Sequence, residues 1–148
     1  MPDKTKKQRQ NAPVAEQEFD VGEDGLTFSL RYADHGYRGA WAWPRGAATE
    51  EVFSFLCHVG ALTWDEIAGQ LFSTKRGSHR KHHSQHVDTL CPEARRRIEA
   101  LKCKQRFGEK IFRFRVGGRK RLWGFKRDGV FYILWWDAEH RVYPAEAR

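Results

Sequence analysis

The sequence predicts an α+β fold in which two or three helices pack on a twisted antiparallel sheet. Apolar residues recur at helical spacing between residues 49 and 101, and strand-like alternation follows Gly108. Two turn signals, Gly117-Gly118 and Asp128-Gly129, divide this last part into a C-terminal three-stranded meander. The chain has 148 residues, 40% of them hydrophobic, which is enough for one core, so we expect a single domain over residues 19–148.

The N-terminal part is expected to contain little regular structure. Residues 1–18 contain four Lys or Arg and no apolar periodicity, which is typical of a disordered basic arm. Apolar and polar residues alternate from Leu26 to Tyr32, and this pattern predicts a half-buried strand. The segment from Gly36 to Trp43 is rich in glycine and aromatic residues, which favours a loop or an irregular strand.

Two helices are expected next. Thr49 is a candidate N-cap for a first helix that Gly60 closes, with Cys57 on its buried side. Thr63 and Glu66 form a capping-box pattern that opens a second helix. The apolar positions of this second helix are Trp64, Ile67, Ala68 and Leu71.

A third helix is expected to present a basic face. Pro92 suits its first turn, and apolar residues recur along one side while arginines point outward on the other. The apolar stripe is Leu90, Ala94, Ile98 and Leu101, and the outward residues are Arg95, Arg96 and Arg97.

Residues 73–86 are almost entirely polar, so we expect a loop or an exposed helix start that contributes nothing to the core. The segment contains four histidines: His79, His82, His83 and His86. On a helix, His82 and His86 would share one face and could bind zinc, yet no third ligand stands at a recognised spacing. We therefore expect no metal ion and no cofactor, and we interpret the segment as a basic loop that faces RNA.

The three expected strands are residues 110–116, 119–127 and 130–136. The turn signals predict a pairing that puts Arg121 on one face of the sheet and Arg113 and Arg115 on the other. At least two of Trp123, Trp135 and Trp136 should lie in the core. The sequence does not decide which face packs on the helices, but in either case the other face exposes cations beside aromatic rings, a combination that binds phosphates and stacks bases.

The distribution of charge points to a polyanionic partner. Residues 75–127 contain 18 Lys or Arg and only 4 Asp or Glu, whereas the whole chain has a net charge of +8. Cations gathered in this way favour a ligand whose phosphates release counterions on binding, and nucleic acid is the first candidate. The residues expected to contact it are Arg80, Lys81, His82, His83, Arg95, Arg96, Arg113 and Lys120.

Composition also excludes several classes of protein. The longest apolar run, residues 130–136, is far too short to span a bilayer, and no apolar segment follows the basic N-terminus. We therefore expect neither a membrane protein nor a secreted one. Three cysteines at unrelated spacings form no disulfide framework and no metal-binding pattern, which favours the reducing cytoplasm.

The last third of the chain, with the helix before it, resembles the RelE and YoeB group of bacterial toxins, which are small ribosome-associated mRNA endonucleases. The resemblance lies in the order of an Arg-bearing strand, the strand KRLWGF, a hydrophobic strand and a terminal His near a Tyr. It implies that Arg121 takes the place of the family's central strand arginine and Arg115 that of the preceding basic position. His140 and Tyr143 correspond to the family's C-terminal His and Tyr.

This resemblance implies RNA cleavage without metal, in which the 2′-hydroxyl attacks its own phosphate. Such a reaction needs a base, a charge stabiliser and an acid. Glu109 or a histidine would take the proton, Arg121 and Arg115 would stabilise the phosphorane, and His140 would protonate the leaving 5′-oxygen. Tyr143 would orient the phosphate or stack a base. The expected partners are RNA, including ribosome-bound mRNA, and an acidic antitoxin protein.

Two alternatives remain open at this stage. One is a non-catalytic nucleic-acid-binding protein of phage or mobile-element origin, in which the same cations only hold phosphates. The other is a metal-dependent nuclease built on the histidines of residues 79–86.

Overall fold

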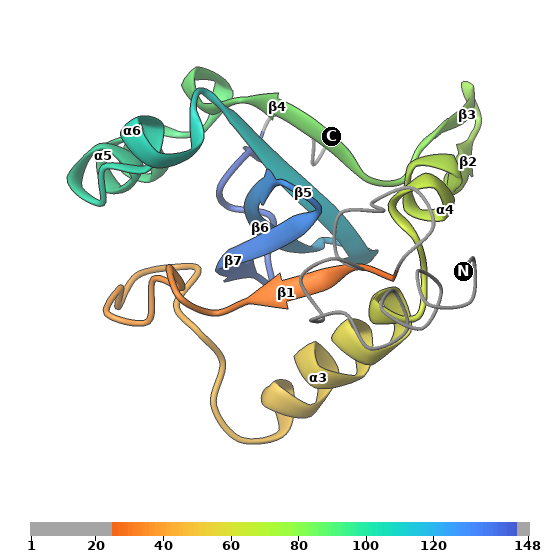
Figure 1. The fold of residues 1–148 in the computed structure, drawn as a ribbon, viewed down its shortest axis with the longest axis horizontal. Coiled ribbons are helices and arrows are strands. Elements are labelled where there is room, and N and C mark those ends of the chain that lie inside the picture. The colour runs from red at the N-terminus through yellow and green to blue at the C-terminus, as the bar shows by residue number, and fades with distance from the viewer. Residues whose placement is uncertain (1–24, 145–148) are drawn as a thin grey trace, which may run out of the picture.

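The computed structural model describes residues 25–144, so the basic arm expected at residues 1–18 lies outside the described part of the chain. A five-stranded sheet forms its centre, in the order β1-β7-β6-β5-β4. Its strands are β1 (Thr27–Ser29), β4 (His83–His86), β5 (Lys110–Gly117), β6 (Lys120–Arg127) and β7 (Val130–Asp137). Two further strands, β2 (Leu71–Thr74) and β3 (Gly77–Arg80), form a separate hairpin beside the beginning of β4 (Figure 1).

Helices connect and cover these strands, which confirms the α+β class. The helical elements are α3 (Ala47–Gly60), α4 (Trp64–Gly69), the 3-10 turn η1 (Val87–Thr89), α5 (Pro92–Ala100) and α6 (Cys103–Phe107). The sheet is mixed rather than wholly antiparallel, because β1 runs parallel to β7 at one edge. Within the described residues, no helix is long and apolar enough to cross a membrane.

The C-terminal meander is confirmed, with antiparallel pairs β5·β6 and β6·β7. Asp128 and Gly129 form the two-residue turn between β6 and β7, and both have a positive φ, of 51° and 80°. This geometry is that of the type I′ hairpin turn, whose twist matches the flanking strands.

The pairing of β5 with β6 differs by one residue from the one expected. Gly117 pairs with Lys120, so the turn is Gly118-Arg119, and a bulge then brings Arg115 opposite Arg121. A slip of one residue exchanges the two faces of a strand. Arg113 and Arg115 therefore lie on the same face as Arg121, and the expectation that they lie on opposite faces was wrong.

Both faces of the sheet are covered. One carries Trp123 and Trp135, which pack against α5, α6 and the segment around Trp41. The other packs against α3 and α4 through residues that include Phe114 and Trp136. All three tryptophans of the meander are thus buried, as expected. The glycine- and aromatic-rich segment has a structural role, since Tyr37 and Trp41 stack with ring centroids 4.8 Å apart.

Of the three start signals predicted for the helices, the structure confirms two. The capping box of Thr63 and Glu66 is present at α4, and Pro92 occupies the first turn of α5. Thr49 is not a cap, because α3 begins two residues earlier and has Gly46 at its N-cap position. Three burial expectations also fail. Cys57 is exposed on α3, Ala68 is exposed on α4, and Leu71 leaves the helix and lies in β2 with 59% of its surface exposed.

Residues 73–86 are neither a loop nor a helix start. They form most of the β2–β3 hairpin and all of β4, which pairs antiparallel with β5. His82 lies between these elements with 2% of its surface exposed, so the segment does contribute a buried residue. Because the segment is extended, His82 and His86 do not share a helical face, and the geometric basis for a zinc pair is lost.

The helix α5 presents a smaller basic face than expected. Arg95 and Arg96 are exposed, but Arg97 turns toward the protein and binds Asp34 through Nε and Nη2, both at 2.7 Å. This hydrogen-bonded pair raises the pKa of Arg97 above its ordinary value. Asp34 also accepts from the indole of Trp135 at 2.9 Å, so the pair ties α5 to the sheet.

Candidate nucleic-acid interface

A cleft of about 1020 Å³ lies between the β2–β3 hairpin and the sheet, at the end where β5 turns into β6. Seven of the thirteen residues that line it are Lys or Arg: Lys75, Arg76, Arg80, Arg113, Arg115, Arg119 and Arg121. Three more are the histidines His79, His83 and His140. None of the lining residues in the described part of the chain is Asp or Glu. The cleft therefore has a strongly positive potential suited to a polyanion.

The cations change in burial from the mouth of the cleft to its floor. Lys75, Arg76 and Arg119 lie in the two hairpin turns and are exposed, whereas Arg113 and Arg121 in the sheet are buried. Buried guanidinium groups are held in place by hydrogen bonds and keep their electrostatic effect at high salt. The floor thus supplies fixed charges, and the mouth supplies flexible ones.

Arg121 is held by the turn that precedes it. Its Nη1 donates to the carbonyl oxygens of Gly118 and Lys120, at 2.7 and 3.0 Å. In the sheet it stands between Arg115 on β5 and Asp137 on β7, its two register partners. This setting fixes the guanidinium at the cleft end of β6.

Arg113 is fixed from β4 and from the C-terminal segment. His83 is its register partner and its hydrogen-bond partner through Nε2. The guanidinium carbon lies 6.0 Å from the ring of Trp123 and 5.8 Å from the ring of Tyr143. Tyr143 therefore supports Arg113 from behind, although it does not itself line the cleft.

His140 is held in an unusual backbone conformation. Its φ is 58°, in the left-handed region that non-glycine residues rarely adopt, and its side chain is buried where it lines the cleft. The next two backbone N–H groups, of Arg141 and Val142, donate to the carboxylate of Asp137 at 2.8 and 2.9 Å. Strained conformations of this kind persist where surrounding contacts enforce them, often at functional sites.

His82 joins the two walls of the cleft from behind. Its Nδ1 accepts the backbone N–H of Arg115 at 2.9 Å, and its Nε2 lies 2.8 Å from Oε1 of Gln70 at the base of the hairpin. Burial, and next the positive charge of Lys81, lowers the pKa of His82 to about 3. The ring is therefore neutral, with its proton on Nε2, and it positions other residues instead of contacting a ligand.

The structure brings together some of the expected residues and leaves others apart. Arg80, His83, Arg113, Arg115, Arg121 and His140 line the cleft. Lys81 does not, and Lys120 is paired with Glu51 of α3 at 2.5 Å. Arg95 and Arg96 extend from α5, outside the cleft.

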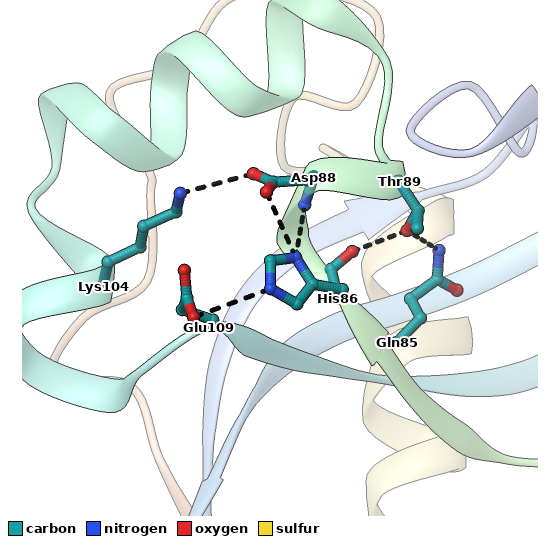
Figure 2. Close-up of polar contacts among 6 residues, drawn as sticks. All are labelled: Gln85, His86, Asp88, Thr89, Lys104 and Glu109. Atoms are coloured by element: carbon teal, nitrogen blue, oxygen red, sulfur yellow. Dashed lines mark hydrogen bonds and ion pairs between the residues drawn. The ribbon is translucent and has the colours of Figure 1, made fainter.

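Glu109 is not placed to act as a base in the cleft. It stands just before β5, where its Oε2 lies 3.7 Å from Nε2 of His86 and where Asp88 and Lys104 complete a small polar cluster (Figure 2). Arg115 stands six positions further along an extended chain, a distance of roughly 20 Å at about 3.3 Å per residue. The expected role of Glu109 in proton transfer is not compatible with this position.

The sequence does not single out two of the lining residues, Arg119 in the turn between β5 and β6 and Phe72 in β2. Lys75, Arg76 and His79 also line the cleft, and they belong to the segment that was expected to face RNA as a loop. The sequence around the β2–β3 hairpin has no apolar alternation, and its one turn signal is the glycine at residue 77, which follows the turn residues Lys75 and Arg76.

Within residues 25–144, no group of three or more His, Cys, Asp or Glu is placed to hold a metal ion. No protein-family model, curated protein or solved structure matches the chain. The candidate function therefore depends on the chemistry of the cleft.

Proposed function

We propose that the protein binds RNA in this cleft and cleaves it without a metal ion. The observation that carries the proposal is the lining of the cleft: seven cations and three histidines, with no carboxylate among its described residues. Phosphate groups satisfy such a surface, since each one neutralises a cation and releases counterions. The resemblance of the meander to the RelE and YoeB toxins supports RNA as the nucleic acid.

Binding would begin at the mouth and end at the floor. The exposed Lys75, Arg76 and Arg119 attract the sugar-phosphate backbone of RNA from solution. Because their side chains are flexible, they do not fix its orientation. The buried Arg113 and Arg121 then offer planar guanidinium groups of fixed orientation, which bind phosphate oxygens in pairs. A phosphate held at the floor shares the cleft with His83 and His140, the two most buried of its three histidines.

His83 and His140 are the groups that would move protons. One, in the neutral form, accepts the proton of the 2′-hydroxyl while the oxygen attacks the adjacent phosphorus. The other, protonated, gives its proton to the departing 5′-oxygen. The P–O5′ bond breaks, and the products are a 2′,3′-cyclic phosphate and a 5′-hydroxyl. Arg115 and Arg121 stabilise the negative charge that develops on the phosphorane.

A toxin of this kind needs a protein that neutralises it. An acidic segment that enters the cleft would satisfy the same cations that hold RNA, and it would compete directly with the substrate. We therefore propose an acidic antitoxin as the protein partner and mRNA, including ribosome-bound mRNA, as the substrate.

The test is cleavage of end-labelled RNA by the full chain, with and without a chelator. We expect cleavage in both, with 2′,3′-cyclic phosphate ends, and loss of cleavage in His83→Gln and in His140→Gln. The matched control is His58→Gln, an exposed histidine on α3, which should cleave like the wild type.

Two results would contradict the proposal. RNA that is bound but never cut would show a binding protein without catalysis. Cleavage that stops in chelator would show a metal-dependent nuclease.

A further inference from the structure

The inner face of the β2–β3 hairpin carries an aromatic ring that has no role in the core. Alternate residues of β2, Phe72 and Thr74, line the cleft, and His79 stands opposite Phe72 on β3. Phe72 belongs to neither of the two hydrophobic clusters that form the core of the described residues. It is also the only phenyl, phenol or indole ring among the described residues that line the cleft.

A planar cation already lies over this ring. The guanidinium carbon of Arg115 is 4.2 Å from the centroid of Phe72, a distance typical of stacked groups. The His79 ring lies beside it, with centroids 5.4 Å apart and planes inclined by 38°. Arg115 is half-buried and Phe72 is on a separate two-stranded hairpin, so the two groups come from different walls of the cleft.

We propose that Phe72 and the guanidinium of Arg115 form a stacking site for one unpaired nucleobase. Because the two groups are in contact, with 4.2 Å between the guanidinium carbon and the ring centroid, the base enters by displacing the guanidinium from the phenyl ring. The base then stacks on Phe72 with one face, and the displaced guanidinium of Arg115 stacks on the other. This inference rests on the proposed binding of RNA in the cleft, and it names the substrate class as single-stranded nucleic acid.

The choice of a base as ligand follows from the chemistry of the two groups. A bare polyanion gains nothing from a phenyl ring, whereas every base has a π-face that stacks on aromatic side chains and on guanidinium planes. Bases within a duplex are stacked on their neighbours and do not offer this face. The cleft should therefore distinguish a single strand from a duplex and from a phosphate chain that lacks bases.

The experiment compares the affinities of a short single-stranded oligoadenylate and of an abasic oligomer of the same length, both built from 2′-deoxy sugars so that neither can be cleaved. We expect the wild type to bind the oligoadenylate more tightly. Phe72→Leu should weaken that binding by about 5- to 150-fold, the usual loss of one stacked base, and leave abasic binding unchanged. Arg115→Lys, which keeps the charge but not the plane, should also weaken oligoadenylate binding more than abasic binding.

Two further variants make the comparison specific. Phe72→Trp should retain or increase the affinity for oligoadenylate, because indole offers a larger stacking surface. Phe53→Leu makes the same exchange at a phenylalanine on α3 that is 66% exposed and outside the cleft, and it should change neither affinity.

The outcomes separate this inference from the function on which it rests. If the wild type binds both oligomers equally, or if Phe72→Leu weakens both equally, the stacking site is wrong while nucleic-acid binding stands. If the wild type binds neither oligomer, the proposed function fails, and the stacking site fails with it.

Discussion

The imidazole of His82 accepts the backbone N–H of Arg115, with 2.9 Å between Nδ1 and the amide nitrogen. The same ring reaches Gln70 on its other side, where Nε2 lies 2.8 Å from Oε1. The backbone carbonyl oxygen of Gln70 in turn accepts the backbone N–H of Lys81, at 2.8 Å. One buried ring thus links the hairpin to the strand that carries Arg115, so that the two walls of the cleft are joined through it.

The first prediction concerns the dependence of stability on pH. His82 has a pKa of about 3 in the folded protein against about 6.5 in the unfolded chain, so the unfolded chain holds the extra proton between these values. Stability contributed by the neutral ring is complete above pH 6.5 and is lost as the pH falls toward 3, at up to about 1.4 kcal/mol per pH unit. Urea denaturation at several pH values measures this slope.

The matched variant for this prediction is His82→Gln, which keeps hydrogen-bonding groups but does not titrate. Its free energy of unfolding should be lower than that of the wild type at neutral pH and should fall less steeply with acid. Parallel pH profiles for the two proteins would show that His82 is not the titrating group.

The second prediction concerns the close approach of β6 and β7 at Gly124. A Cβ atom there would lie 2.2 Å from the carbonyl oxygen of Tyr132 and 2.6 Å from a ring carbon of Phe131. Gly124→Ala should therefore destabilise the protein by about 1–3 kcal/mol or more, since the backbone must move. The control is Gly69→Ala at the end of α4, where nothing lies within 4 Å of the added atom, and its unfolding should be nearly unchanged.

The third prediction concerns growth. If the protein is a toxin, its expression in bacteria should arrest growth, and His140→Ala or Arg121→Ala should relieve the arrest. Arg121 is buried and binds two carbonyl oxygens, so circular dichroism must show that each variant is folded. Folded variants that remain fully toxic would remove both residues from the site.

The meander shows how much of the structure could be predicted from the sequence alone. The Asp128-Gly129 turn and the alternation of apolar residues predict the first and last residues of all three strands to within one position. The bulge beside Val116 could not be inferred, because two neighbouring glycines allow the turn to form in either of two positions. This single residue decides whether Arg115 and Arg121 share a face.

The hairpin that closes the cleft shows a second limit. Its residues are nearly all exposed, so they lack the burial pattern on which prediction of strands depends. A tertiary contact, that of Phe72 with Arg115, and the buried link through His82 hold it beside the sheet. Such contacts between distant segments leave no local signal, and for this reason the burial of His82 could not be predicted from the polar sequence around it.

The most direct test of the central claim is the affinity of the cleft for single-stranded RNA, measured by fluorescence anisotropy over a range of salt concentrations. The double variant Arg76→Glu with Arg119→Glu reverses two exposed charges at the mouth of the cleft. Arg95→Glu with Arg96→Glu makes the same change of net charge on α5, outside the cleft. The second pair is the matched control.

We predict that the cleft variant binds RNA at least about ten-fold more weakly than the wild type, and that its salt slope decreases by about 0.7 for each phosphate that it no longer neutralises. The control should stay within about two-fold of the wild type, because screening limits the effect of distant charges. Equal decreases in affinity in the two double variants would show that RNA responds only to net charge, and would contradict binding in the cleft.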